Sequence, residues 1–327
     1  MTLLILSEHD VEELLTMEEC IAVMEDALAA LARGEVHNPL RQAIRAAGAP
    51  GLLGLMPAWR SSGTPYYALK EVCVFPENPK RGLDTHLGAV ILHSGETGEP
   101  LAIVNAAAVT AIRTAAVSAV ATKLLARDDA KVLAILGAGV QAKSHLKAIP
   151  LVRGIEEIRQ YSRGPVEDRR SRLSGQTGLS VLHVESAEDA VRGADIIVTA
   201  TNSREPILRR EWLSPGVHIN AVGSSIAAAR ELDGATVAAA LLFVDRREST
   251  MNEAGDYLFA VVEGSISGPD HIRAELGELL TGQASGRKSV DEITLFKSLG
   301  LAVEDLASAA FLYEKAVRLG RGSWVDF

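Results

Sequence analysis

Residues 131–149 read KVLAILGAGVQAKSHLKAI, an apolar run that enters a glycine turn and continues as a helical pattern. The first glycine of such a turn allows the chain to bend sharply, and the second lets a pyrophosphate approach the backbone. A small third residue lets helix and strand pack closely, and the helix N-terminus offers N–H groups to the phosphates. The motif therefore predicts a dinucleotide-binding turn formed by Gly137, Ala138, Gly139, Val140, Gln141 and Ala142.

The residues after this turn continue as short apolar runs, several of them separated by helical segments. After KVLAIL, the strand candidates are EEIRQYSR, LSVLHVES, ADIIVTATNS, GVHINAVGSS and ALLFVDRRES. Short apolar strands that alternate with helices are typical of a parallel sheet covered on both faces. We therefore predict an α/β fold with a Rossmann-type, doubly wound parallel sheet over residues 131–293.

The first third of the chain has a different pattern. TMEECIAVMEDALAALARGE predicts a helix with Thr16 as N-cap, Glu19 completing a capping box and Gly34 ending it. Strand-like runs such as LLIL, GLLGLMPAW, YYALKEVCVF, LGAVILHS and LAIVNA are separated by Gly and Pro turns. A second, α+β domain is predicted over residues 1–127, and the final helix, AVEDLASAAFLYEKAVRLG, could pack back on it.

Composition narrows the class of protein. With 327 residues, 47% apolar and 23% charged, the chain has the balance of an ordinary globular protein. A net charge of −9 and an aromatic content of 4% argue against nucleic acid or an anionic membrane as partner. Cys20 and Cys73 form no ligand cluster, and no metal-ligand spacing is found. Since no signal-peptide pattern and no run near ~20 apolar residues is found, we expect a cytoplasmic protein without a metal.

The end of the second strand bears on which dinucleotide is bound. An NAD site expects an acid there, which binds the ribose 2′-hydroxyl. In this sequence the strand ends in SRGP (162–165), and the first acid is Glu167. Arg163, with Arg169 or Arg170, would bind a 2′-phosphate, although arginines are also ordinary in a solvated turn. The pattern favours NADP(H) over NAD(H).

Three cationic side chains of the first domain are candidates for chemistry. Arg113 lies on an apolar helical face, and no Asp or Glu occurs between residues 100 and 127. Burying its guanidinium requires an anion, which is either an acid from elsewhere in the fold or a ligand carboxylate or phosphate. Lys70, in YALKEVCV, is an ordinary edge-strand lysine or, if desolvated, an acid or base. Arg41 follows a proline in a loop, where a solvated arginine is normal.

Several segments together resemble the ornithine cyclodeaminase/μ-crystallin family. They are GLMPAW, ALKEV, AIRTAAVSAVATKLLA, ILGAGVQA, HINAVGSS…REL and FKSLGLAVED, and they run in order through most of the chain. The resemblance implies a homodimer with its active site in a cleft between two domains. A substrate-binding and dimerisation domain would comprise residues 1–127 plus 300–327, and a Rossmann domain residues 128–299.

The resemblance also implies roles for individual residues. Arg41 and Arg113 would bind a substrate carboxylate, and Lys70 would act at the reacting centre. Ser162 and Arg163 look like the NADPH-binding version of the strand end. The remaining cofactor contacts that we expect come from Thr85, His86 and Ser298 near the nicotinamide, Thr114 and Arg113 near the phosphates, and Ala200, Thr201 and Val222 at the ends of later strands.

One departure from the family bears on the reaction. True cyclodeaminases carry an aspartate shortly after VGG, whereas this chain has Ser225 there and no acid before Glu231. Without that acid, ammonia elimination is undermined, but hydride transfer between NADPH and a C=N bond is not. The resemblance, with this departure, therefore implies an oxidoreductase that transfers a hydride at the α-carbon of an imino or amino acid, as a ketimine reductase or an amino-acid dehydrogenase, and with NADPH the expected direction is reduction of a cyclic ketimine or an imino acid. Ser225 and Glu253 are expected among the substrate contacts, with Arg41, Lys70 and Arg113. The alternatives are a cyclodeaminase that uses a different acid and recycles NAD, and an NADPH-dependent binding protein, which an apolar cleft with Glu253 near the ligand would favour.

Overall fold

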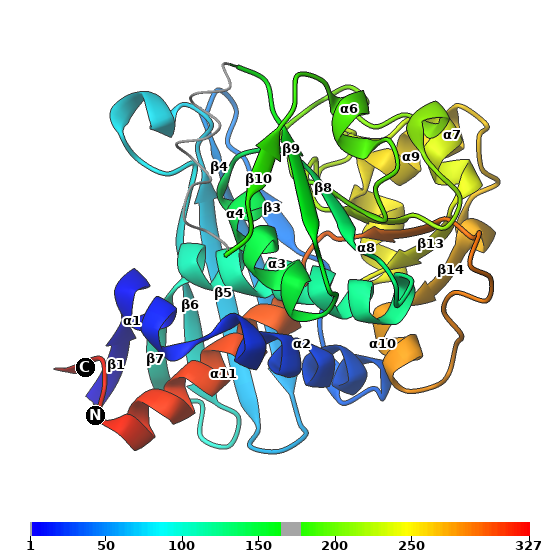
Figure 1. Cartoon of the computed structure of the whole chain (residues 1–327). Coiled ribbons are helices and arrows are strands. Elements are labelled where there is room, and N and C mark those ends of the chain that lie inside the picture. The colour runs from blue at the N-terminus through cyan, green and yellow to red at the C-terminus, as the bar shows by residue number, and fades with distance from the viewer. Residues whose placement is uncertain (1, 165–177) are drawn as a thin grey trace. The chain divides into compact units, whose positions relative to one another are not determined.

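The computed structural model describes residues 2–164 and 178–327 (Figure 1). The chain divides into two compact units, Met1–Arg113 with Gly300–Phe327, and Thr114–Leu299. The boundary falls inside helix α3 (Ala106–Leu125), whereas the boundary suggested by the sequence lies just after this helix. The second half of α3 belongs to the second unit because its polar side chains bond there: Ser118 to His145 at 2.8 Å, and Thr122 to Asn220 at 2.9 Å.

The first unit is built on a mixed sheet. Its strands are, in spatial order, β16 (Ser323–Asp326), β1 (Thr2–Leu6), β7 (Pro100–Asn105), β6 (His86–Ser94), β5 (Tyr66–Val74), β4 (Leu52–Arg60) and β2 (Val36–His37), with β3 (Gln42–Ile44) also paired to β4. β1 and β7 are parallel, and the other pairs are antiparallel. β5 is therefore an interior strand, hydrogen-bonded on both sides.

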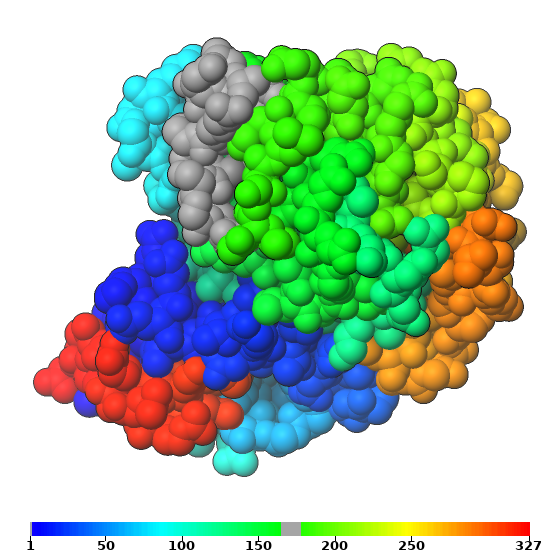
Figure 2. All heavy atoms as spheres, in the orientation of Figure 1, coloured from blue at the N-terminus to red at the C-terminus, as the bar shows by residue number. Residues whose placement is uncertain are grey.

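Helices cover one face of this sheet. They are α1 (Glu8–Leu14), α2 (Met17–Ala32) and the C-terminal α11 (Ala302–Leu319), while Asn78–Arg81 forms a 3-10 turn. The capping box is confirmed: the Glu19 amide donates to Thr16 Oγ1 at 3.2 Å and the Thr16 amide to the Glu19 carboxylate at 3.1 Å. α11 packs along α2 and against β5, and Figure 2 shows α2 in blue beside α11 in red. The final helix thus returns to the N-terminal sheet.

The second unit holds an all-parallel sheet, which confirms the predicted fold class. Its spatial order is β10 (Val181–His183), β9 (Glu157–Tyr161), β8 (Val132–Leu136), β11 (Ile196–Thr199), β12 (His218–Ala221), β15 (Thr294–Lys297), β13 (Leu241–Val244) and β14 (Ile272–Glu275). The six strands that the sequence indicated are present. β15 lies between β12 and β13, and β14 extends the sheet beyond β13; β14, with the sequence IRAE, is too short and polar to show a strand pattern.

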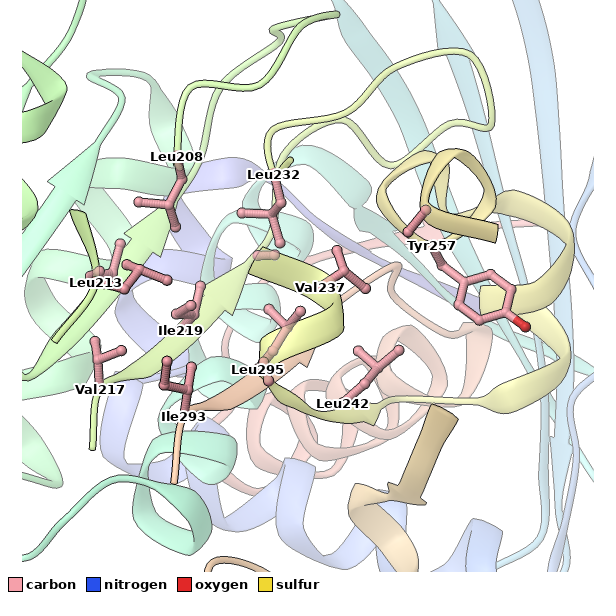
Figure 3. Packing of buried hydrophobic residues seen from close by; sticks show 14 of the residues in the cluster. Leu208, Leu213, Val217, Ile219, Leu232, Val237, Leu242, Tyr257, Ile293 and Leu295 are labelled. Atoms are coloured by element: carbon pink, nitrogen blue, oxygen red, sulfur yellow. The ribbon is translucent and has the colours of Figure 1, made fainter. Parts of the chain in front are cut away.

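Apolar side chains fill both faces of the parallel sheet. On β8, Ala134 and Leu136 join one buried cluster, and Leu133 and Ile135 join the other. Figure 3 shows part of the first cluster, where Leu208, Leu232 and Val237 point toward the sheet residues Ile219 and Leu295. Each fully buried aliphatic side chain contributes about 1.5–3 kcal/mol. The helices of this unit are α4 (Val140–Ala148), α6 (Ala187–Val191), α7 (Gly234–Ala239), α8 (Arg247–Glu253), α9 (Gly255–Val262) and α10 (Leu276–Leu280), with 3-10 turns at Ile149–Leu151, Arg210–Trp212 and Pro269–His271.

Helix α3 has the length and hydropathy of a membrane span, which the sequence analysis did not expect of any segment. It is the one such helix in the described part of the chain, and 72% of its apolar window is buried within the protein. That burial marks α3 as a core helix, because a spanning helix would present its apolar surface to lipid.

Candidate active site

Lys70 lies in the middle of β5, opposite Met56 of β4 and Val90 of β6. It is 4% exposed, on the sheet face that α11 covers. The interpretation of Lys70 as an ordinary edge-strand lysine is therefore wrong. Strand alternation places Lys70 on the same face as Ala68, and the helix that buries this face comes from the other end of the chain.

Two side-chain oxygen atoms accept hydrogen bonds from the Lys70 ammonium. Its Nζ lies 3.0 Å from Asp305 Oδ1 and 2.6 Å from Thr110 Oγ1, and the Thr110 hydroxyl donates to the Ala106 carbonyl at 2.7 Å. Burial lowers the pKa of Lys70 to about 8, although the Asp305 carboxylate opposes this effect. A lysine in this range can exchange a proton near neutral pH, as acid–base catalysis requires.

Arg113 is also buried, and its anions come from α11. Nη1 lies 2.7 Å from Glu304 Oε2, and Nε lies 3.3 Å from Asp305 Oδ1. Both acids are almost completely buried. The sequence left open whether an acid from elsewhere in the fold or a ligand anion compensates the Arg113 charge. The structure contains such acids, Glu304 and Asp305. The acid-free stripe around Arg113 does not by itself demand a ligand anion.

Glu304 and Asp305 were not among the functional residues that the sequence predicted. Both lie in the first turn of α11, where carboxylates favour the helix N-terminus, so they look unremarkable in sequence. The available signal was the apolar sequence on both sides of the pair, LAV and LASAAF, which indicates a buried segment. Asp305 Oδ1 contacts both Lys70 and Arg113 and so joins the two predicted catalytic cations into one cluster.

Arg41 lies in the loop between β2 and β3 and is half-buried. In the same loop, Asn38 Oδ1 accepts the Val303 amide at 2.8 Å, which anchors the loop to the start of α11. Thr85 and His86 lie where β6 begins, and the Thr85 carbonyl accepts the Phe75 amide at 2.9 Å. His86 pairs with Val74, which shares a strand face with Lys70 but lies four residues further along β5.

The glycine turn of the second unit has the geometry that its sequence predicts. Gly137 has φ of +135°, and a Cβ there would collide with the Ala200 carbonyl oxygen. Gly139 caps α4, and a Cβ there would meet no atom within 4 Å. Ala142 is completely buried. The turn thus leaves open space at the N-terminus of α4, where a phosphate would bind.

The end of β9 is bonded directly to this turn. The Gly137 backbone amide donates to the Tyr161 carbonyl at 2.8 Å, and the side-chain Nε2 of Gln160 donates to the Gly137 carbonyl at 2.8 Å. Ser162 and Arg163 follow, half-buried and exposed respectively. Arg169 and Arg170 lie outside the described residues.

The later strand ends meet at the same edge of the sheet. The Val222 amide donates to the Thr199 carbonyl at 2.9 Å, and the Ser298 amide to the Ala221 carbonyl at 3.0 Å. Ala200 and Thr201 directly follow β11, and Ser298 directly follows β15. Thr114, on α3, is 7% exposed. Ligands of parallel α/β sheets bind at the carboxyl ends of the strands.

A buried carboxylate network that no sequence pattern indicated lies at this edge. Glu231 accepts hydrogen bonds from Thr199 Oγ1, Thr201 N and Thr201 Oγ1, each at 2.7 Å. Burial raises the pKa of Glu231, against the opposing effect of the Lys297 ammonium. Lys297 pairs with Asp256 at 2.8 Å and donates to the Gly223 carbonyl at 2.8 Å. The network therefore holds the ends of β11 and β12.

Ser225 and Glu253 are both half-buried. Ser225 follows Ser224, which has φ of +50° and is the one non-glycine residue with positive φ in the described part of the chain. The backbone at residues 226 and 229 packs so closely on Gly255 that a side chain there would collide with it. The Ser225 loop and the end of α8 are thus neighbours. In the described ranges, no His, Cys, Asp and Glu side chains form a group that could hold a metal ion.

Comparisons with known proteins agree with this architecture. A family model described as the ornithine cyclodeaminase/mu-crystallin family matches residues 1–319. A Δ1-pyrroline-2-carboxylate reductase of Bacillus cereus is 39% identical over 330 residues, covering 99% of this chain and 100% of its own. The structure of a Thermococcus litoralis Δ1-pyrroline-2-carboxylate reductase in complex with NADH and L-proline is 41% identical, with a TM-score of 0.93 over 98% of this chain and 99% of that one. An archaeal alanine dehydrogenase, solved as a dimer with bound NAD, is 36% identical, with a TM-score of 0.93 over the full length of both chains.

Proposed function

Since this chain belongs to the ornithine cyclodeaminase/mu-crystallin family and is an NAD(P)-dependent reductase or dehydrogenase of imino or amino acids, we propose that it reduces a cyclic ketimine carboxylate such as Δ1-pyrroline-2-carboxylate. The observation that carries this proposal is the near full-length similarity to two reductases of that substrate. On the side of the chain's own chemistry, the buried Lys70 with its pKa of about 8 supports it.

The proposed reaction adds a hydride to the α-carbon and a proton to the nitrogen of a C=N bond. A bound NAD(P)H supplies the hydride. Lys70 donates the proton to, or polarises, the imine nitrogen. Arg41 and Arg113 bind the substrate carboxylate and thereby orient the α-carbon. Glu304 and Asp305 fix the orientation of the Arg113 guanidinium.

Absorbance at the reduced-nicotinamide band tests this proposal. The purified protein is incubated with NADPH or NADH and with cyclic ketimine carboxylates of five- and six-membered rings, or with pyruvate plus ammonia. We expect oxidation of the nicotinamide with the cyclic ketimines. Oxidation only with pyruvate and ammonia would indicate an alanine dehydrogenase. Ammonia release from ornithine with NAD would indicate a cyclodeaminase, and inactivity throughout would favour a binding protein.

The proposed cofactor is NADP(H), with Arg163 binding the 2′-phosphate. Arg163 supports this because it is exposed and lies two residues beyond Tyr161, whose carbonyl bonds Gly137 of the phosphate-binding turn. The relatives with bound NADH or NAD show that the family also accepts the cofactor without a 2′-phosphate.

Arg163→Ala is expected to reduce the preference for NADPH over NADH by about tenfold or more. A charge-assisted hydrogen bond to phosphate contributes roughly 1.5–3 kcal/mol, and about 1.4 kcal/mol corresponds to tenfold. The measurement is the ratio of kcat/KM for the two cofactors. Arg273→Ala is the matched control, because Arg273 is also an exposed arginine but lies on β14, the edge strand farthest from β9. An unchanged ratio in Arg163→Ala would exclude the assignment.

We also propose that the chain forms a homodimer through the face of the first sheet that α11 does not cover. Along β4, residues 54, 56 and 58 are buried under the helices, while alternate residues point the other way. The outward side chains are mainly large and apolar, and they are half-buried or exposed: Leu53, Leu55, Trp59, Tyr67, Leu69, Ile91 and Ile103. A second copy of the chain is the proposed cover for this face.

Leu69→Glu is expected to convert the dimer to a monomer. Leu69 lies between Pro57 and Ile91 on the neighbouring strands, so the carboxylate would be placed in the middle of the apolar face. Light scattering coupled to size-exclusion chromatography measures the mass. Val262→Glu is the control, since Val262 is 84% exposed on the second unit. A dimer that persists in Leu69→Glu, or a wild-type monomer, would refute this interface.

A further inference from the structure

We infer that Asp305 is a positioning residue for the proposed reaction, and that it keeps the Lys70 ammonium protonated and directed, whereas Glu304 chiefly holds Arg113. The inference rests on the proposed function, because it assigns Asp305 its effect through Lys70. Neither acid was a candidate in the sequence, and the two are adjacent in the first turn of α11. Their contacts nevertheless differ.

The contacts of Lys70 distinguish the two acids. Asp305 Oδ1 lies 3.0 Å from Nζ and, with Thr110 Oγ1 at 2.6 Å, fixes the ammonium from two directions. Glu304 bonds Arg113 Nη1 at 2.7 Å, and its charge favours the protonated form of Lys70 less strongly than that of Asp305 does. The side chains of Lys70 and Asp305 are 5% and 1% exposed, so water screens their attraction little.

The charges around Lys70 determine what Asp305 does. Asp305 and Glu304 face it from α11, Arg113 faces it from α3, and His86 lies at the start of the neighbouring strand β6. Burial and the Arg113 charge both favour loss of the Lys70 proton, while the two carboxylates favour its retention. Neutralising Asp305 would leave the Lys70 and Arg113 cations together with one carboxylate. The ammonium would then lose its proton at lower pH.

An Asp305 carboxylate whose charge is compensated mainly by Arg113 would give a different result. Its replacement would lower stability and would shift the pH at which Lys70 titrates no more than loss of the Glu304 charge does. Asp305→Asn keeps the shape and an oxygen that can accept from Nζ, but it removes the charge. Glu304→Gln makes the same change one residue away and is the matched control.

The test is NMR of lysine side chains labelled with ¹³C at Cε, followed against pH. The chain contains only nine lysines, and the Lys70 signal is identified by its absence in Lys70→Met. Wild-type Lys70 is expected to titrate near pH 8. In Asp305→Asn the midpoint should fall by about one pH unit or more, because a carboxylate this close typically changes a pKa by that much. Glu304→Gln should shift it less, and Asp305→Glu should restore it.

An unchanged midpoint in Asp305→Asn, or an equal shift in Glu304→Gln, would overturn the inference. Should Asp305→Asn fail to fold, Asp305→Ser removes the same charge in a smaller side chain. The pH dependence of kcat/KM separates this inference from the proposed function. With Lys70 as the acid, kcat/KM falls as pH rises through its pKa, and this fall should move to lower pH in Asp305→Asn. A shifted NMR midpoint with an unmoved kinetic profile would support the Asp305 role and contradict Lys70 as the proton donor.

Discussion

Lys70→Met is expected to lower kcat for ketimine reduction by about 10²–10⁴-fold, because that is the usual contribution of a positioned acid or base. Methionine has a similar length and can occupy the buried space against Met56 and Val90. Asp305 keeps Arg113 as a partner at 3.3 Å, so the substitution does not leave an isolated buried carboxylate. The loss is therefore expected in turnover, with the protein still folded. Steady-state kinetics and the Tm measure the two effects.

Lys315→Met provides the control for this variant. Lys315 lies on α11 and pairs with Glu19 of α2 at 2.6 Å, and this pair is partly exposed and is not part of the Lys70 cluster. Pairs of this kind contribute roughly 0–1 kcal/mol, so Lys315→Met should keep the wild-type kcat. A Lys70→Met enzyme within about tenfold of wild type would show that Lys70 is not the principal proton donor.

Gly139→Ala is expected to weaken NAD(P)H binding by about tenfold or more while leaving the Tm of the free protein unchanged. An added Cβ at Gly139 has no protein atom within 4 Å, and its φ of −83° suits alanine. The methyl group would instead occupy the space that a pyrophosphate needs next to the backbone. A tenfold loss corresponds to about 1.4 kcal/mol. Fluorescence titration with NADPH measures the affinity.

Gly137→Ala is the informative contrast, because this substitution is expected to lower the stability of the free protein. At φ of +135°, and with the Ala200 carbonyl in the way, an alanine must distort the turn. We expect a lower Tm as well as weaker binding. If Gly139→Ala bound NADPH as the wild type does, the phosphate would not lie at this turn.

Local patterns in the sequence were sufficient for several of these features. Thr16, Glu19 and Gly34 define a helix from end to end, because capping depends on residues three or four apart. The glycine turn is likewise local, since its conformation and its strand and helix lie within 131–149. Such patterns carry their physical cause within a single stretch of chain.

Local sequence patterns could not predict which side chains surround Lys70 and Arg113. Lys70 and Asp305 are 235 residues apart, and Arg113 and Glu304 are 191 apart. Periodicity places Lys70 and Arg113 on particular faces, but only the packing of α11 shows what covers those faces. Glu231 is a similar case, because its partners Thr199 and Thr201 come from a different strand end about thirty residues earlier. Long-range packing thus determines which charged and polar side chains meet at each of the two sites.

Hydride transfer to the α-carbon of a ketimine is tested by following an isotope from cofactor to product. The protein is incubated with Δ1-pyrroline-2-carboxylate and NADPH that carries deuterium at C4 of the nicotinamide, in each stereochemical form, and the product is analysed by mass spectrometry. We expect proline with one deuterium at Cα from one of the two forms. Proline without deuterium from either form, or NADPH that remains reduced while the ketimine is unchanged, would contradict the account.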